Sequence, residues 1–328
     1  MLKKLVMSFL MLCLVALIAS WQLYEQFKQQ PLVEKTVIFE VIKGNSLDSI
    51  SRRLNYKAPH NNLWLKLLAY ESNLTTKLKA GEYELIAGML PKEFLVLLSQ
   101  GKVRQYDITL VEGWNFKQVK QALIRQEGIT SVLSGLSDAA ILNTLGNHYP
   151  HIEGTFFPDT YRYEKGTTDL AILTRAYQKM QTVLSEQWQH KSADLPLKNS
   201  YEALILASII EKETANSSER SKIAGVFVQR LLRGMRLQTD PTVIYGMGDN
   251  YQGNIRKKDL RTKTAYNTYK IKGLPPTPIA MPSKESIYAA LHPEQSDNLY
   301  FVAKGKQGLH QFSATLAEHN KAVNRYQR

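Results

Sequence analysis

The fold prediction starts from one segment in the second half of the chain, NSYEALILASIIEKETANSSER at residues 199–220. Asn199 and Glu202 have the spacing of a capping box, so a helix begins there. Residues 203–210 are apolar apart from one serine, and a helix that is hydrophobic on all sides has to be buried. The segment therefore predicts a core helix whose last turn carries two carboxylates.

Those carboxylates, Glu211 and Glu213, are candidates for acid–base chemistry. The negative end of the helix dipole and partial desolvation both raise the pKa of a carboxyl there, and a carboxyl protonated near neutral pH can serve as a general acid in glycosidic cleavage. The two side chains point about 200° apart, so only one can face a given cleft. Both faces are apolar, so the spacing leaves the choice open. In the alternative interpretation, Lys212 or Arg220 neutralises them.

Short strands and helices alternate through the first half of the chain, which predicts a mixed α+β fold. We expect strands at 37–42, 81–86 and 106–111, and helices at 47–54, 91–98, 116–125, 137–145 and 169–190. The 328 residues suffice for two ordinary domains. The pattern weakens over 129–149, so we place a domain boundary near residue 150.

The N-terminus contains an uncharged apolar run at residues 5–23, preceded by Lys3 and Lys4. About 20 apolar residues span a bilayer as a helix, and a basic flank stays cytoplasmic. Trp21 and Tyr24 would then anchor the far interface. We expect a cytoplasmic tail at 1–4, a single transmembrane anchor at 5–24 and a polar linker at 25–35.

A cleaved signal peptide is the alternative for this run, because small residues occur at 16–20. In either case the bulk of the chain leaves the cytoplasm. We therefore expect the large C-terminal part to be periplasmic or otherwise extracytoplasmic.

Composition excludes several classes of function. Lys plus Arg (42) against Asp plus Glu (29) gives a net charge of +13, but an exported protein does not meet the genome, so we expect no nucleic-acid partner. One cysteine excludes a disulfide framework and a thiolate zinc site. The sequence has no HExxH, GxxxxGK[ST] or GxGxxG motif. We expect neither a metal nor an organic cofactor.

Residues 256–272 form the most basic segment, with seven Lys or Arg against one Asp and with tyrosines interleaved. A solvated loop is one interpretation. The other is a surface for acidic partners outside the cytoplasm, such as carboxylates of cell-wall peptides or anionic lipid headgroups.

Several phrases of the sequence resemble known families. FEVIKGNSLDSISRRL resembles the opening of a LysM module, a small fold that binds GlcNAc-containing polymers, and IEKETA resembles the glutamate-then-hydroxyl signature of lysozyme-like lytic transglycosylases. Longer phrases resemble the YceG-like family of endolytic murein transglycosylases: ASIIEKETA, VFVQRLLRGMRLQTDPTVIYGMG, TAYNTYKIKGLPPTPIAMPS and ALHPEQSDNLYFVA. The resemblance implies a LysM-like and connecting α+β region at 36–150 and a catalytic domain with a lysozyme-like helix at 151–328.

The resemblance also implies a reaction. Glu213 takes the position of the catalytic acid and Thr214 that of the hydroxyl residue. Such enzymes cleave between MurNAc and GlcNAc without water and form 1,6-anhydro-MurNAc ends, so a second carboxylate is optional. Only Asp240 and Glu153 are plausible partners, and Asp240 followed by Pro241 is typical of a structural turn.

The segments at 238–246 and 266–269 combine hydrogen-bonding groups with aromatic rings, as sugar recognition requires. We expect these loops to line a cleft around Glu213. The candidate substrate-binding residues are Gln238, Thr239, Asp240, Tyr245, Asn267 and Tyr269.

The anchor and the resemblance together imply a single-pass protein of the bacterial inner (plasma) membrane with a cytoplasmic N-terminus. Its substrate would be nascent peptidoglycan glycan strands, and its partners peptidoglycan synthases. Two alternatives remain: a muramidase that uses water, and a non-catalytic glycan-binding scaffold.

Overall fold

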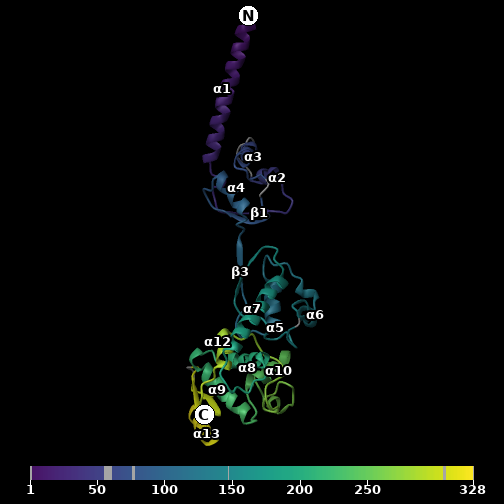
Figure 1. The fold of residues 1–328 in the computed structure, drawn as a ribbon, viewed down its shortest axis with the longest axis vertical. Helices are drawn as coiled ribbons and strands as arrows, with labels where there is room; N and C mark the ends of the chain where they lie inside the picture. The colour runs from purple at the N-terminus through teal and green to yellow at the C-terminus, as the bar shows by residue number, and fades with distance from the viewer. Residues whose placement is uncertain (1, 55–60, 76–77, 147, 306–307, 328) are drawn as a thin grey trace. The chain divides into compact units, whose positions relative to one another are not determined.

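The computed structural model describes residues 2–54, 61–75, 78–146, 148–305 and 308–327. Its contacts divide the chain into two compact units, Met1–Tyr106 and Asp107–Arg328. The boundary expected near residue 150 falls inside the second unit, where Phe116 and Phe156 stack with ring centroids 5.3 Å apart. The mixed α+β class and the apolar N-terminal helix are confirmed (Figure 1).

The first unit combines a long N-terminal helix with a small α+β cluster. Its helices and strands are α1 (Leu2–Gln29), β1 (Val37–Val41), α2 (Leu47–Arg53), α3 (Asn61–Glu71), β2 (Gly81–Leu85) and α4 (Pro91–Gln100). β1 and β2 pair antiparallel, with Phe39 opposite Tyr83. These two rings and the apolar faces of α3 and α4 form one buried cluster.

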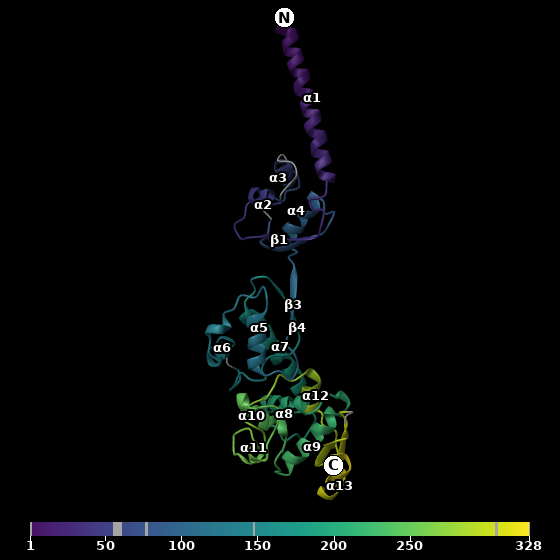
Figure 2. The same cartoon turned by 180° about the vertical axis from the view of Figure 1, so that it is seen from behind.

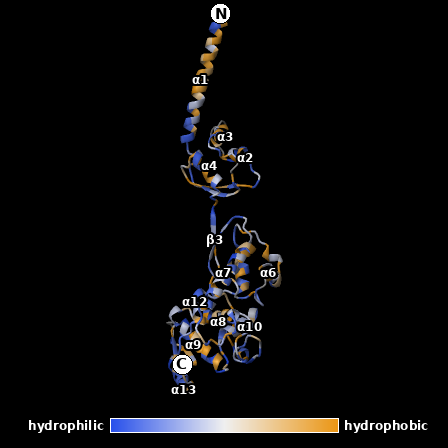
Figure 3. Cartoon of the chain, viewed as in Figure 1, coloured by the Kyte–Doolittle hydropathy of each residue, from blue (hydrophilic) through white to orange (hydrophobic). Residues whose placement is uncertain are grey.

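Helix α1 is long and apolar enough to cross a membrane, and hydrophobic residues cover most of its length (Figure 3). It runs to Gln29, so the first residues of the expected linker are helical. Tyr24 and Phe27 are buried in the first unit's core, and the Tyr24 hydroxyl donates to Glu71 at 2.6 Å. Of the two expected interfacial aromatics, Trp21 is exposed, whereas Tyr24 packs against protein.

The second unit is built around α8 (Ser200–Glu213). Its other helices are α5 (Phe116–Arg125), α6 (Asp138–Thr144), α7 (Asp169–Gln189), α9 (Arg220–Leu232), α10 (Asp240–Met247), α11 (Lys257–Arg261), α12 (Lys284–Leu291) and α13 (Leu316–Tyr326), with single 3₁₀ turns η1 (Leu133–Gly135), η2 (Ser217–Glu219) and η3 (Gly248–Asn250). Helices α7, α9, α10 and α12 all contact α8 (Figure 2).

The strands of the second unit are short. β3 (Gln105–Thr109), most of which lies in this unit, pairs with β4 (Thr160–Glu164), and β5 (Tyr300–Ala303) pairs antiparallel with β6 (His310–Ser313). The expected buried helix is confirmed, because every residue from Ala203 to Ile210 is buried. Its one polar member, Ser208, donates to the Ile205 carbonyl and accepts from the Ile279 amide, so the core has a satisfied hydroxyl.

Candidate active site

The last turn of α8 gives its two carboxylates different surroundings. The Glu211 side chain is 7% exposed, and its Oε2 accepts hydrogen bonds from the Ser283 amide at 2.9 Å and the Ser286 hydroxyl at 2.7 Å. The Ser283 hydroxyl and Arg220 also contact the Glu211 carboxylate. These partners occupy the Glu211 carboxylate fully, so it holds the start of α12 against α8.

Glu213 lies beside an open pocket. Its Oε1 accepts a hydrogen bond from the Thr239 hydroxyl, and the side chain lines a cavity of about 660 Å³, the Glu213 pocket. No Lys, Arg or His within the described ranges forms an ion pair with it. The sequence left the choice between the two glutamates open, and the environment now distinguishes them.

Burial raises the pKa of the Glu213 carboxyl, and the negative charge of Asp240 raises it further. The hydrogen bond from Thr239 and the positive charges of His310 and Arg230 act in the opposite direction. Burial is the largest of these effects, so the carboxyl holds its proton to a higher pH than an exposed glutamate.

The segment leading into α10 brings polar groups to the Glu213 pocket. Gln238 has a left-handed backbone (φ +51°), which is uncommon for a residue other than glycine and is found where tertiary contacts impose it. The Gln238 and Thr239 amides both donate to Thr268, which holds this conformation. The backbone turn directs the Thr239 hydroxyl to Glu213.

Asp240 and Pro241 begin helix α10 instead of forming the isolated turn that the sequence suggested. Proline is accepted in the first turn of a helix because its missing N–H has no intrahelical partner there. The Asp240 carboxylate accepts a hydrogen bond from the Tyr269 hydroxyl at 2.7 Å. Both residues line the Glu213 pocket.

Two of the expected substrate-binding residues lie elsewhere. The Asn267 side chain is buried, and its Nδ2 donates to the carbonyls of Asp259, Leu260 and Thr262. Tyr245 donates its hydroxyl to Glu153 at 3.0 Å and lines a different cavity. The structure therefore gathers Gln238, Thr239, Asp240 and Tyr269 around Glu213, but neither Asn267 nor Tyr245.

The C-terminal elements complete the Glu213 pocket with residues that no sequence pattern indicated. Arg230, Tyr300, His310 and His319 come from α9, β5, β6 and α13. Arg230 is buried and donates to the carbonyls of Leu237 and Leu299. These residues are far from Glu213 in sequence and form no local motif, so only the fold reveals them.

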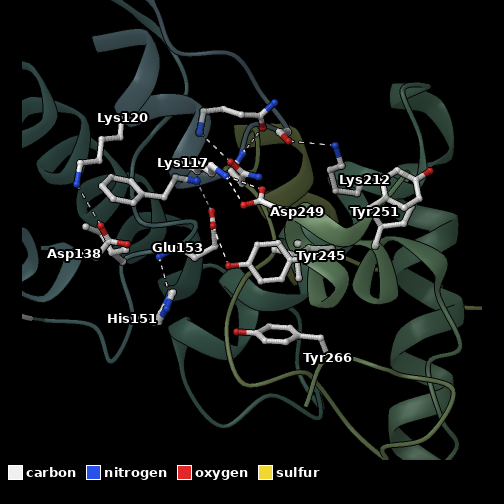
Figure 4. A pocket seen from close by; sticks show the side chains of 18 of the residues that line it. Lys117, Lys120, Asp138, His151, Glu153, Lys212, Tyr245, Asp249, Tyr251 and Tyr266 are labelled. Atoms are coloured by element: carbon white, nitrogen blue, oxygen red, sulfur yellow. Dashed lines mark hydrogen bonds and ion pairs between the residues drawn. The ribbon is translucent and has the colours of Figure 1, made fainter. Parts of the chain in front are cut away.

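A second, larger cavity surrounds Glu153 (Figure 4). This Glu153 pocket has a volume of about 940 Å³, and Glu153 is 4% exposed at its wall. The carboxylate accepts hydrogen bonds from the Phe116 and Gly154 amides and from the Tyr245 hydroxyl. Burial raises the pKa of Glu153 to about 7, although these three hydrogen bonds oppose the shift.

The turn after Glu153 requires glycine. Gly154 has φ +75°, and a Cβ added there would lie 2.4 Å from the Pro278 side chain. Any larger residue at position 154 would therefore clash with Pro278 and strain the turn.

Metal ligation does not explain either carboxyl. Among the residues that the structure describes, no group of three or more His, Cys, Asp or Glu side chains is arranged to hold a metal ion. What Glu213 can do is exchange a proton with a molecule in its pocket, because a partly dehydrated carboxyl with a raised pKa is suited to general acid–base catalysis.

A carboxyl with a raised pKa beside a pocket has the chemistry that an acid–base enzyme requires, and comparison with known proteins identifies the relatives of this chain. The chain belongs to the YceG-like family, whose model matches residues 39–325. It is 35% identical over 270 residues to the endolytic murein transglycosylase of Bacillus subtilis strain 168, a match that covers 76% of this chain and 73% of the relative. The resemblance to the YceG-like family, inferred from the longer sequence phrases, is confirmed.

Two further matches agree. The endolytic murein transglycosylase of Streptococcus pneumoniae serotype 2 is 29% identical over 281 residues, covering 76% of this chain and 50% of the relative. The crystal structure of a yceG-like protein from Listeria monocytogenes is similar at a TM-score of 0.53 and 30% identity, covering 88% of this chain and 100% of that one.

Proposed function

We propose that this protein is a membrane-anchored endolytic lytic transglycosylase that cuts nascent murein strands between MurNAc and GlcNAc and so terminates their elongation. The names of the relatives and the family membership support the activity. The observation that carries the assignment to a residue is the Glu213 carboxyl, which faces an open pocket and has a raised pKa.

Glu213 acts first as an acid and then as a base. Its proton passes to the glycosidic oxygen as the bond from the MurNAc anomeric carbon breaks and GlcNAc leaves. The Glu213 carboxylate then takes the proton of the MurNAc C6 hydroxyl, whose oxygen bonds to the anomeric carbon and closes the 1,6-anhydro ring. The carboxyl ends in its starting state and no water is consumed, so one carboxylate suffices.

The neighbours of Glu213 have separate tasks. The Thr239 hydroxyl orients the carboxyl through its hydrogen bond, and the Asp240 charge helps to keep it protonated. Gln238 and Tyr269 offer an amide and an aromatic ring to sugar at the pocket wall. Asn267 acts at a distance, by holding the chain segment that carries Tyr269.

The length and apolar composition of the N-terminal helix support a reaction close to a membrane. Helix α1 crosses the bacterial inner (plasma) membrane with residues 1–4 in the cytoplasm, and the remainder is periplasmic or otherwise extracytoplasmic. The β1, α2 and β2 elements form a LysM-like subdomain within residues 36–150, residues 151–328 form the catalytic part, and α8 serves as its lysozyme-like helix. Peptidoglycan synthases, which release new strands at this surface, are the partners.

The test is Glu213→Gln in the full-length, detergent-solubilised protein, with uncrosslinked glycan strands as substrate. Cutting should vanish while strand binding persists, because the amide keeps the side chain's size but cannot donate and recover a proton. Glu186→Gln is the matched control, since Glu186 is an exposed carboxylate on α7.

Product mass separates the remaining alternatives. Anhydro ends are lighter by one water than reducing ends, so reducing ends in the wild-type digest would identify a hydrolytic muramidase. Strands that bind to the wild-type protein but stay intact would identify a scaffold. Continued cutting by Glu213→Gln would remove Glu213 from the catalytic role.

A further inference from the structure

The Glu153 pocket is separate from the Glu213 pocket, but neighbouring residues of the chain line the two cavities. Lys212 lines the Glu153 pocket, and the next residue, Glu213, lines the other. At the start of α10, Asp240 lines the Glu213 pocket and the next residue, Pro241, lines the Glu153 pocket. At the end of α8 and at the start of α10, residues that are adjacent in the chain, with Cα atoms 3.80 Å apart, therefore line both cavities.

The charged side chains of the Glu153 pocket largely cancel. Lys117 pairs with Asp249 at 2.6 Å, joining α5 to η3, and Lys120 lies 3.6 Å from Asp138. The Lys212 ammonium donates to a backbone carbonyl. Such a lining does not select a charged ligand, and it therefore favours a neutral, polar molecule over an acidic peptide.

Aromatic rings form another part of the lining of the Glu153 pocket. Tyr245 and Tyr266 lie side by side with ring centroids 4.9 Å apart, and Tyr251 lines the same cavity (Figure 4). The Tyr245 hydroxyl is directed to the Glu153 carboxyl. Ring faces next to hydrogen-bonding groups match a sugar ring, which has apolar C–H faces and polar hydroxyl edges.

We propose that the Glu153 pocket is a second saccharide-binding site, which holds neutral sugar residues of the same glycan strand whose scissile bond lies at Glu213. The proposal rests on the proposed function. The volume of the Glu153 pocket, about 940 Å³, is within the range of small-molecule sites. An enzyme that cuts inside a chain benefits from such a site, because binding energy from a remote part of the substrate can orient the reacting bond.

The experiment measures affinity as a function of strand length. In the Glu213→Gln background, fluorescence anisotropy is recorded with labelled peptide-free murein oligosaccharides, from a tetrasaccharide to long strands. Two substitutions alter the second site in different ways: Tyr251→Ala removes a ring, and Gln121→Trp fills the cavity from the exposed side of α5. The controls are Tyr288→Ala on α12 and Gln178→Trp on α7, both outside the two pockets.

We expect the parent protein to bind long strands more tightly than the tetrasaccharide. Both pocket substitutions should weaken long-strand affinity about tenfold, equivalent to about 1.4 kcal/mol, and the controls should leave it unchanged. Circular dichroism and thermal unfolding show whether each variant is folded, and Gln121→Trp keeps the test valid if Tyr251→Ala is not.

Two results would overturn the second site: no dependence of affinity on strand length in the parent protein, or equal long-strand affinity in all variants. These outcomes are distinct from failure of the proposed function. Cutting activity in the Glu213→Gln background would refute the catalytic role, whatever the length dependence shows.

Discussion

Glu211 and Glu213, two residues apart at the end of α8, have carboxylates with unlike partners: Ser283, Ser286 and Arg220 surround the first, and Thr239 contacts the second. A helix separates such positions by about 200°. One carboxylate is therefore enclosed by α12 and α9 and the other faces a cavity. The same helical turn therefore carries one carboxylate enclosed by hydrogen-bond partners and one that lines a pocket.

Glu211→Gln should destabilise the second unit. The substitution leaves the buried Arg220 guanidinium without its carboxylate, and breaking a buried pair typically costs about 3–5 kcal/mol. Urea unfolding followed by circular dichroism measures the loss. The exposed Glu186→Gln should change the free energy of unfolding by less than about 0.5 kcal/mol. Glu211 is not structural if the two variants unfold alike.

Thr239→Ala should shift the pH dependence of cutting. The Thr239 hydroxyl stabilises the Glu213 carboxylate and so lowers its pKa, and removing the hydroxyl lets the pKa rise. The protonated acid then persists to higher pH, so the descending limb of the kcat/KM profile moves upward. Thr239→Ser keeps the hydroxyl and should retain the wild-type limb. An unmoved limb in Thr239→Ala would disprove this coupling.

Stability should depend on pH through Glu153. Its pKa is about 7 in the folded protein against 4.5 for an ordinary glutamate. Between these values the folded state binds the extra proton, so the free energy of unfolding falls as pH rises from about 4.5 to about 7. At 1.36 kcal/mol per pKa unit, the loss is about 3 kcal/mol.

Glu153→Gln isolates this contribution, because the amide is neutral at every pH and can still accept from the Phe116 and Gly154 amides. Glu213 also has a raised pKa, so the relevant quantity is the difference between the two proteins. Urea unfolding at pH 5, 6, 7 and 8 should show the wild type losing stability relative to the variant. Parallel curves would contradict the prediction.

Asn267→Ala should loosen the basic segment. The Asn267 amide group donates to three backbone carbonyls, those of residues 259, 260 and 262. These hydrogen bonds are partly buried, and carbonyls left there without a donor cost up to about 3 kcal/mol, so the segment should open more often. Hydrogen exchange of peptides covering residues 257–272 measures the opening. The control is Asn254→Ala, because Asn254 is exposed. Equal exchange in both variants would show that the hydrogen bonds of Asn267 do not stabilise the segment.

Several elements could be predicted from the sequence because their signals are local. Asn199 accepts a hydrogen bond from the Glu202 amide, as its capping spacing indicates, and Asn115 accepts one from the Gln118 amide at the start of α5. Helix α5 spans the predicted residues for this reason. The burial of α8 also followed from its composition, since no polar face exists to meet water.

Other features depend on partners far away in the chain. Tyr24 contacts Glu71 and Trp64, and neither partner can be inferred from the N-terminal sequence pattern. Asn267 has an amide side chain of the kind that binds sugars, but here the amide donates to backbone carbonyls and holds the surrounding loop. The site residues Arg230 and His310 carry no local signal.

The sequence by itself determined the apolar N-terminal helix, the buried α8 with two terminal carboxylates and the family resemblance, because periodicity, capping and consecutive phrases are properties of neighbouring residues. Only the tertiary structure decided which glutamate meets a cavity. That choice depends on Ser283 and Thr239 approaching the two sides of one helix from distant segments, and side-chain spacing within the helix contains no information about what packs against it.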